Sequence, residues 1–573
     1  LSQNFTSATN AYNIAIGYGT GALVTTGTQN VLIGALAGDA LTDADFNVAI
    51  GTSALTSDTL GSRSTAIGTS ALATQNLTSA TDVYNTALGF AAGQAVTTGI
   101  RNTLIGGLAG DALTDADFNV VLGFGALSTD TLGSKSVAIG SEALHSQNFT
   151  SATNAFNTAV GVNAGYAVST GIQNPLIGGL AGDSITTGSN NVAFGYLSLS
   201  ANTTASDNSA FGVNALSSNT TGTTNTALGR STLRANTTAS HNTAVGYNSL
   251  TANTTGDRGV AVGKDALLAN TTGSQNIGVG YLAMDANTTG SANTALGSEA
   301  LGSNTTSNYN TAVGVVALAA NTTGEGNTAS GAFALNQATT SSSNTAIGFQ
   351  ASRYLTTGAS NVAVGYLAVG GTGVVTGSNN TGVGVSALKA NTTGANNTAL
   401  GGFALDANTT ASNLVAIGNN ALGKNTTGAL STAIGSSALA ENTTGAENVA
   451  IGYLALTNNT TGTHNVAVGS SDGSSGATLG TNSTGSQNTA LGMQALGSNS
   501  TASNNTAVGY QSLKANTTGH SNVAVGMNAL RTTQTSAAQT AVGFNALAVA
   551  TGHYNTALGF YASGANTTGT ENV

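Results

Sequence analysis

Apolar and polar residues recur along this chain with a period of 17, and their spacing does not follow the 3.6-residue period of a helix. The repeated unit is N-T-A-V-G-x-x-A-L-x-x-N-T-T-G-x-x. The glycine after its first apolar segment marks each copy, and in the middle of the chain it stands at Gly246, Gly263, Gly280, Gly297, Gly314, Gly331, Gly348 and Gly365. The series runs from Gly17 to Gly559, about 32 copies. Such a period indicates a repeat architecture and argues against a string of globular domains.

The spacing departs from 17 at only a few places. It is 21 at Gly68–Gly89 and Gly140–Gly161, 19 at Gly365–Gly384, 23 at Gly469–Gly492 and 16 at Gly543–Gly559. We interpret these as loops that swell or shrink at one corner, with longer loops near residues 366–380 and 470–487. A 72-residue super-repeat lies within residues 1–161, where residues 2–9 recur as 74–81 and 146–153, and residues 162–573 carry mostly plain repeats. We therefore expect one continuous array over residues 1–573.

A 17-residue unit has room for two short strands and two turns, but not for two helices. We expect each unit to be one coil of an all-β, parallel β-solenoid (a β-roll), with identical residues stacked in columns about 4.8 Å apart. The glycine after the first strand supplies a positive φ, and the N-T-T-G run supplies the second turn. About 32 such coils predict a rod of roughly 150 Å.

The strand segment suggests that more than one chain assembles. In Thr243-Ala244-Val245 the outer two residues share one face and Ala244 takes the other. The Thr position is itself apolar at Val260, Val362, Val449 and Val466, so both faces of the strand are largely apolar. A coil has one interior, so we expect the second face to be buried against other chains, most simply around a three-fold axis. The alternative is a lone solenoid whose outer Ala column is small and harmless.

Composition supports a strand-and-turn architecture and narrows the partners. Charged residues make up 6% of the chain, and there are 78 Gly, one Pro (Pro175) and no Cys. The scarcity of charged helix formers argues against helices, and the Cys count excludes disulfides. A net charge of −10 without basic patches makes nucleic acid an unexpected partner. No apolar run approaches 18 residues, so we expect no membrane span.

The repeat resembles sequences of known fibrous proteins. Asn47-Val48-Ala49-Ile50-Gly51 and Ser136-Val137-Ala138-Ile139-Gly140 are similar to the S-V-A-I-G-x-x-A unit of trimeric autotransporter adhesin heads. The N-T-A-x-G-x-x-A-L pattern also resembles repeats of phage-type and bacterial tail-fibre proteins. The resemblance implies a trimeric, surface-exposed fibre used for attachment. This chain differs in its longer period and in showing no neck, heptad stalk, anchor, receptor-binding tip or chaperone domain.

Residues that could carry catalysis are sparse. The histidines His145, His241, His464, His520 and His553 are far apart and follow no ligand pattern. One G-x-S-x-G match, Gly469 to Gly473 around Ser471, lies in the longest insertion without a following helix. We expect neither enzyme activity nor a cofactor.

Two acidic clusters are weak candidates for calcium ligands. Asp39, Asp43 and Asp45 form the first, and Asp111, Asp115 and Asp117 repeat it 72 residues later. Calcium prefers clustered oxygen ligands, but no known calcium-loop pattern is present. The alternative interpretation is that they are solvated turn residues.

The Asn-Thr-Thr units also match the acceptor pattern for N-glycosylation. The candidate acceptors are Asn236, Asn253, Asn270, Asn287, Asn304 and Asn321. A modified chain would carry a row of sugars at coil spacing. Turn chemistry alone also explains the motif.

These features predict the structural shaft of an extracellular fibre at a cell or virion surface. We expect the chain to associate with itself, to hold a tip away from the cell or virion, and to have a surface glycan or receptor as a further partner. An ice-binding or glycan-binding solenoid and a carbohydrate-active β-helix enzyme are the alternatives. Leu1 begins in mid-repeat and Asn572-Val573 open another unit, so we also consider a longer array or an end-to-end filament.

Overall fold

The computed structural model describes residues 10–473 and 476–573. The described chain is an all-β parallel solenoid of about 32 turns, and no helix occurs in it. It divides into two compact units, Leu1–Thr289 and Gly290–Val573. The first super-repeat segment, residues 2–9, lies outside the described residues.

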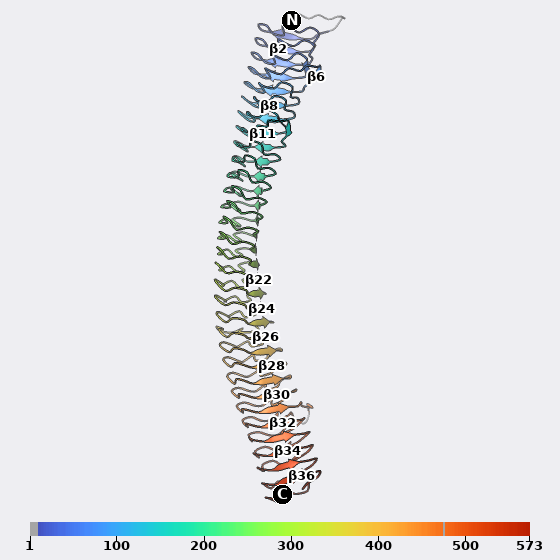
Figure 1. Cartoon of the computed structure of the whole chain (residues 1–573), viewed down its shortest axis with the longest axis vertical. Helices are drawn as coiled ribbons and strands as arrows, with labels where there is room; N and C mark the ends of the chain where they lie inside the picture. The colour runs from blue at the N-terminus through green and yellow to red at the C-terminus, as the bar shows by residue number, and fades with distance from the viewer. Residues whose placement is uncertain (1–9, 474–475) are drawn as a thin grey trace. The chain divides into compact units, whose positions relative to one another are not determined.

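Each turn of the first unit contributes one strand to a long parallel sheet (Figure 1). These strands are β1 (Ile14–Ile16), β2 (Val31–Ile33), β3 (Val48–Ile50), β5 (Thr65–Ile67), β7 (Thr86–Leu88), β8 (Thr103–Ile105), β9 (Val120–Leu122), β11 (Val137–Ile139), β13 (Thr158–Val160), β14 (Pro175–Ile177), β15 (Val192–Phe194), β16 (Ser209–Phe211), β17 (Thr226–Leu228), β18 (Thr243–Val245), β19 (Val260–Val262) and β20 (Ile277–Val279). Two small parallel sheets stand beside it, formed by β4 (Gly61–Ser62) with β6 (Thr81–Asp82) and by β10 (Gly133–Ser134) with β12 (Thr153–Asn154).

The second unit is built in the same way. Its strands are β21 (Thr294–Leu296), β22 (Thr311–Val313), β23 (Thr328–Ser330), β24 (Thr345–Ile347), β25 (Val362–Val364), β26 (Thr381–Val383), β27 (Thr398–Leu400), β28 (Val415–Ile417), β29 (Thr432–Ile434), β30 (Val449–Ile451), β31 (Val466–Val468), β32 (Thr489–Leu491), β33 (Thr506–Val508), β34 (Val523–Val525), β35 (Thr540–Val542) and β36 (Thr556–Leu558).

Strands pair so that equivalent residues of successive repeats lie opposite one another. Thr243 of β18 pairs with Val260 of β19, 17 residues later. Where the repeat is longer, the register still holds, as in the pairing of Thr65 with Thr86 and of Val466 with Thr489. The inserted residues therefore leave the ladder at a corner, and the two 21-residue repeats use them to form the small sheets β4–β6 and β10–β12.

The prediction of two strands per coil is wrong for the ordinary repeat. Each plain coil has a single three-residue strand, and turns and bends make up the rest. The cause is visible in the coil that begins at Asn242, where Asn248, Leu250 and Arg258 have φ of 56°, 50° and 57°. Left-handed residues at these three places bend the backbone too often for a second regular strand, although successive coils stay hydrogen-bonded there, as in Leu250 N–H to Ala266 O at 3.0 Å.

The middle residue of each strand points into the coil. Ala244 is fully buried, whereas its neighbours Thr243 and Val245 are half-buried. The Ala column is therefore inside, and the alternative of an outer Ala column is wrong. Inside the coil Ala244 is accompanied by Leu250, which is 1% exposed, and by the buried Asn253.

Core volume is conserved by exchanging large and small residues within one coil. In the coil of β2 the middle residue is Leu32, and the position normally held by Leu is Gly38. A Cβ at Gly38 would lie 2.9 Å from Leu32 Cδ2, so the two positions compete for the same space. The same exchange recurs at Leu176 and Gly182, where a Cβ on Gly182 would lie 2.9 Å from Leu176 Cδ2. The interior thus stays close-packed although its members change.

The two glycines of the repeat unit lie in different backbone conformations. Gly246 has a φ of 123°, as predicted for the corner after the strand, and a Cβ there would lie 2.6 Å from the carbonyl oxygen of Gly263. Gly256, in the N-T-T-G segment, has no positive φ, but a Cβ there would lie 2.4 Å from Gly273 O. Other coils nevertheless carry a buried alanine at this position, as at Ala205 and Ala239, so neither the turn conformation nor the approach of the next coil strictly requires glycine there.

Candidate functional site

The six candidate glycosylation residues lie inside the coils, with side chains no more than 1% exposed. Asn253 is typical: its Nδ2 donates to Asn236 Oδ1 at 3.1 Å and to Gly256 O at 3.0 Å. Its Oδ1 accepts from Asn270 Nδ2 at 2.9 Å. The amide nitrogen that would carry a glycan is thus buried and used in a ladder along the stack, and the folded structure favours the turn interpretation of this motif.

A second Asn column holds the start of each strand. Asn242 Nδ2 donates to Gly256 O at 3.0 Å, and Asn242 Oδ1 accepts from the backbone N–H of Gly259 in the next coil at 2.7 Å. The backbone N–H of Asn242 in turn donates to Asn225 Oδ1 at 3.0 Å. The side chain of Asn242 therefore closes its own coil and bonds the next one, and its backbone N–H bonds the preceding one.

The threonines of the N-T-T-G segment are divided between the stack and the surface. Thr254 Oγ1 donates to Thr271 O of the next coil at 3.0 Å. Thr255, the second threonine, is exposed. Each ordinary coil therefore presents one exposed threonine from this segment, and these threonines form a single row.

In the first acidic cluster, each carboxylate accepts a hydrogen bond from an adjacent coil. Asp43 Oδ1 accepts from Thr26 Oγ1 at 2.5 Å, and Asp45 Oδ1 accepts from Thr28 N–H at 2.6 Å. Asp39 Oδ1 accepts from Thr56 Oγ1 at 2.5 Å, in the opposite direction along the stack. These bonds fix the carboxylates as turn residues of individual coils.

The second cluster repeats this arrangement with one change. Asp115 Oδ1 accepts from Thr98 Oγ1 at 2.6 Å, and Asp117 Oδ1 accepts from Ile100 N–H at 2.7 Å. Ser128 stands where the first copy has Thr56, and its Oγ lies 2.9 Å from His145 Nδ1. Asp111 Oδ1 is left buried without a hydrogen-bond partner among the described residues. Burial raises the pKa of Asp111, an effect opposed by its own backbone N–H and by His145.

The two clusters do not form a recognisable metal centre. Within residues 10–473 and 476–573, no group of three or more His, Cys, Asp or Glu side chains is arranged to hold a metal ion. Calcium binding stays a prediction from the sequence.

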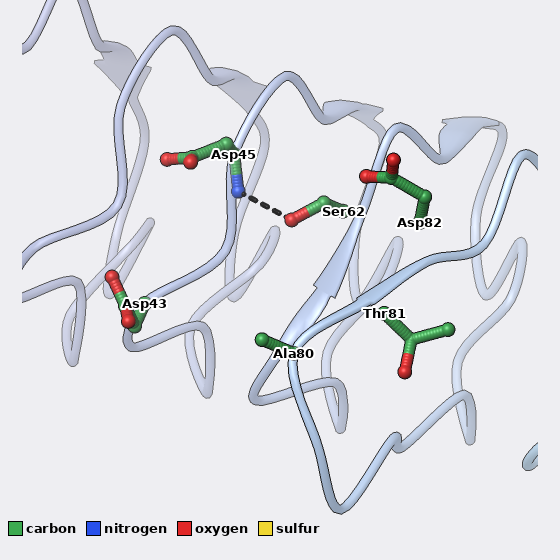
Figure 2. Close-up of a pocket in the computed structure, with 6 residues that line it drawn as sticks. All are labelled: Asp43, Asp45, Ser62, Ala80, Thr81 and Asp82. Carbon is green, nitrogen blue, oxygen red and sulfur yellow. Dashed lines mark hydrogen bonds between the residues drawn. The ribbon is translucent and has the colours of Figure 1, made fainter.

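The first 21-residue repeat builds a pocket that the sequence did not predict (Figure 2). Its volume is about 410 Å³, and its lining consists of Asp43, Asp45, Ser62, Ala80, Thr81 and Asp82. Ser62 belongs to β4, Thr81 and Asp82 form β6, and Ser62 Oγ accepts from the Asp45 N–H at 2.9 Å. The pocket thus combines the turn carboxylates of one coil with the inserted small sheet, and it offers acceptors for hydroxyl or ammonium groups.

Beside this pocket runs a column in which aromatic and cationic residues alternate. Arg63 places its guanidinium 4.7 Å from the ring centre of Phe46 and 5.7 Å from that of Tyr84. Its Nε also lies 2.8 Å from Asp82 Oδ1, a contact that raises the pKa of Arg63 and joins the column to the pocket wall. The column continues with Arg101 over Phe118 at 5.3 Å and Lys135 over Phe156 at 5.2 Å. This alternation can be recognised in the sequence, since each member of the column stands directly before the first residue of a repeat. The left-handed corner that stacks these residues is visible only in the structure.

The G-x-S-x-G match does not resemble a nucleophile site. Ser471 Oγ accepts a hydrogen bond from Gly473 N–H at 3.0 Å. A pocket of about 270 Å³ includes Ser471 and Gly473, and its lining contains no histidine, aspartate or glutamate. The histidines are placed apart from it: His464 Nε2 lies 3.0 Å from Glu447 Oε2, and His145 stacks on Tyr166 with ring centres 5.1 Å apart.

The outward side of the strands is apolar over both units. The last residue of every long-sheet strand, which we call the strand row, is aliphatic or aromatic except Ser330, and none is fully buried. Two residues later, after the corner glycine, a second row carries many exposed aromatic residues, and we call it the corner row. Its aromatic members exposed by 38% to 84% are Tyr18, Phe90, Phe124, Tyr196, Tyr247, Tyr281, Phe349, Tyr366, Tyr453, Tyr510 and Phe560. Sequence reasoning detected the strand row but overlooked the corner row.

Comparisons with known proteins add no family to this description. No family model matches the chain, and a search of curated proteins finds no relative. Among the described residues, no helix has the length and apolar character needed to cross a bilayer.

Proposed function

We propose that this chain is the structural shaft of an extracellular or surface fibre, built from several copies of the chain and acting without catalysis. Three copies around a long axis are the simplest assembly, in line with the resemblance of the repeat to adhesin heads. The main support for this proposal is that the repeated polar side chains hold successive coils together. Asn242, Asn253 and Thr254 each bond to the neighbouring coil, so the residues that recur most regularly hold the stack together.

Such a stack suits a mechanical role. Pulling one coil from the next breaks the strand ladder, both Asn columns and the Thr bonds together, and these groups are largely buried. Buried hydrogen bonds also keep the backbone away from proteases, which need an unfolded segment. The amount of apolar surface that the chain exposes also favours an assembly of several copies, since a soluble single chain rarely exposes so much.

The experiment measures assembly and location. Light scattering on the purified chain is expected to give a multiple of the 55.5 kDa chain mass, and three times that mass supports the trimer. Antibodies against the chain should label intact cells or particles of its source. A monodisperse single chain would contradict the shaft built from several copies, and long filaments would favour end-to-end assembly.

Glycan binding is a second candidate function, favoured by the pocket between the first acidic cluster and β6. Asp43, Asp45 and Asp82 offer carboxylate acceptors for sugar hydroxyls, and Tyr84 lies next to them, with its hydroxyl 3.5 Å from Asp82 Oδ2. The surrounding negative charge favours a neutral sugar over an anionic one.

Native electrophoresis of the chain through gels containing neutral polysaccharides, such as mannan or hydroxyethylcellulose, tests this second function. We expect retardation of the wild-type chain and about tenfold weaker retention of the Asp45→Ala, Tyr84→Ala double variant. Tyr309→Ala is the matched control, because Tyr309 is a 72% exposed aromatic residue at the same repeat position in the other unit. Equal mobility of the wild-type chain with and without polysaccharide would contradict glycan binding here.

A further inference from the structure

The two apolar rows of each unit run next to one another. The strand row and the corner row are separated by one glycine, so their Cα atoms lie within about 7 Å in every ordinary coil. In the first unit, Leu122 is 43% exposed and Phe124 is 59% exposed on either side of Gly123. In the second unit, Ile451 and Tyr453 are 38% and 49% exposed on either side of Gly452. We call the two rows together the apolar band.

The apolar band is large enough to be an interface. Strands stacked at about 4.8 Å make the band of one unit about 70 Å long. With a width of about 10 Å it covers about 700 Å² per unit, close to the roughly 800 Å² that each partner contributes to a standard interface. The largest apolar patch on a typical monomer is only about 300–600 Å².

Among the residues that the structure describes, the apolar band contains two charged residues, Arg230 and Lys264. Both lie in the corner row of the first unit. Lys264 Nζ lies 3.6 Å from Asp265 Oδ2 and 5.5 Å from the ring centre of Tyr281. Its charge is therefore partly compensated within its own chain. The strand row itself contains no charged residue in either unit.

We infer that the apolar band is the surface on which a second copy of this chain docks. A second copy fits best because the band has almost no charge to pair, its strand row is apolar from coil to coil, and its corner row adds aromatic residues among small and polar ones. A second copy offers a surface with the same repeat and therefore matches the band along its length. This inference rests on the proposed shaft of several copies and specifies the face where the copies meet.

Paired charge substitutions on one pair of coils test the face. Ile434→Glu with Ile451→Glu places two carboxylates in the strand row, where the native residues are 37% and 38% exposed. Thr444→Glu with Thr461→Glu places the same charges on the same coils at exposed threonines outside the apolar band. We expect the first pair to weaken association at least tenfold by light scattering across a dilution series, and the second pair to assemble as the wild type does. Circular dichroism verifies that both pairs are folded.

A milder measurement guards against misfolding of the charged variant. The chain has no cysteine, so Ile434→Cys and Thr444→Cys each introduce a single thiol. We expect maleimide to label Cys at 434 several-fold more slowly in the assembly than after dilution to single chains, and to label Cys at 444 at the same rate in both. Assembly of the Ile434→Glu, Ile451→Glu variant at wild-type strength, or equal labelling at 434, would overturn the inference while leaving the multi-copy shaft in place. A wild-type chain that stays a monomer at all concentrations would contradict both this inference and the multi-copy shaft.

Discussion

At the scale of single residues, glycine determines how closely successive coils can stack. Gly246 combines a φ of 123°, which side-chain-bearing residues rarely adopt, with the carbonyl oxygen of Gly263 at 2.6 Å from where its Cβ would be. Both features oppose any larger residue, since the obstacle is backbone and cannot rotate away. Gly125 has a positive φ of 61° as well, but a Cβ there would meet only side-chain atoms at 3.8 Å or more.

The pair compares a glycine that has both an unusual φ and a backbone obstacle with a glycine that has an ordinary left-handed φ and room for a Cβ. Gly246→Ala is expected to lower the free energy of unfolding by about 3 kcal/mol or more, because strain and overpacking add. Gly125→Ala should cost only about 1 kcal/mol, the penalty of a left-handed alanine. Urea denaturation followed by circular dichroism measures both, and equal losses would show that coil contact contributes nothing.

The role of a residue could be predicted from the sequence only where its pattern fitted a single interpretation. The positive φ of Gly246 followed directly from its place after a strand. Asn253 matched both a turn residue and a glycan acceptor, and only its burial and its bond to Asn236 distinguish the two. The close packing of Gly256 against the next coil could not be predicted, because sequence contains no measure of the distance between coils.

At the scale of the element, each repeat of the sequence corresponds to one coil of the structure. Every ladder joins a residue to its equivalent in the next coil, so removal of one whole repeat should leave equivalent partners. In a chain lacking residues 242–258, Asn225 Oδ1 can accept from Gly259 N–H, and β17 can pair with β19. The stability of a repeat protein is approximately the sum of the stabilities of its coils and of the contacts between neighbouring coils. Deletion of one whole coil therefore costs little stability.

Deletion of residues 242–258 is accordingly expected to leave the melting temperature within a few degrees of the wild type, because each coil contributes only a small share. Deletion of residues 242–250, about half a coil, should reduce the melting temperature strongly or cause aggregation, because Asn, Gly and Leu columns no longer meet. Thermal melting followed by circular dichroism distinguishes the two. Similar melting of both deletion variants would contradict the coil as the unit of stability.

The period predicted the number and boundaries of coils well, but it did not predict their internal structure. The spacing of 17 admits two strands, and the left-handed Asn248, Leu250 and Arg258 decide against the second one. Leucine rarely adopts a positive φ, so no propensity argument from sequence would have placed Leu250 there. Its burial against the strand alanines is what compensates this conformation.

At the scale of the whole molecule, the sequence established the architecture and left open which face points inward. Both sides of the strand are apolar, and only residue size distinguishes them. The exchange of Leu32 with Gly38 shows that these two core positions share one space within their coil, a constraint that can be recognised in the sequence once it is known. The pocket at β6 was not predicted, because it depends on how inserted residues fold back beside the stack, and the aromatic–cation column was not predicted, because it depends on the left-handed corner before each strand.

The equivalence of successive coils also has a genetic consequence. A gene that encodes nearly identical repeats misaligns readily with its own copies during recombination, and each unequal exchange adds or removes whole repeats. Since any such product keeps its columns in register, copy number is free to drift without selection against misfolding. Related lineages should therefore differ in the length of this protein by whole coils, most often in steps of 17 codons.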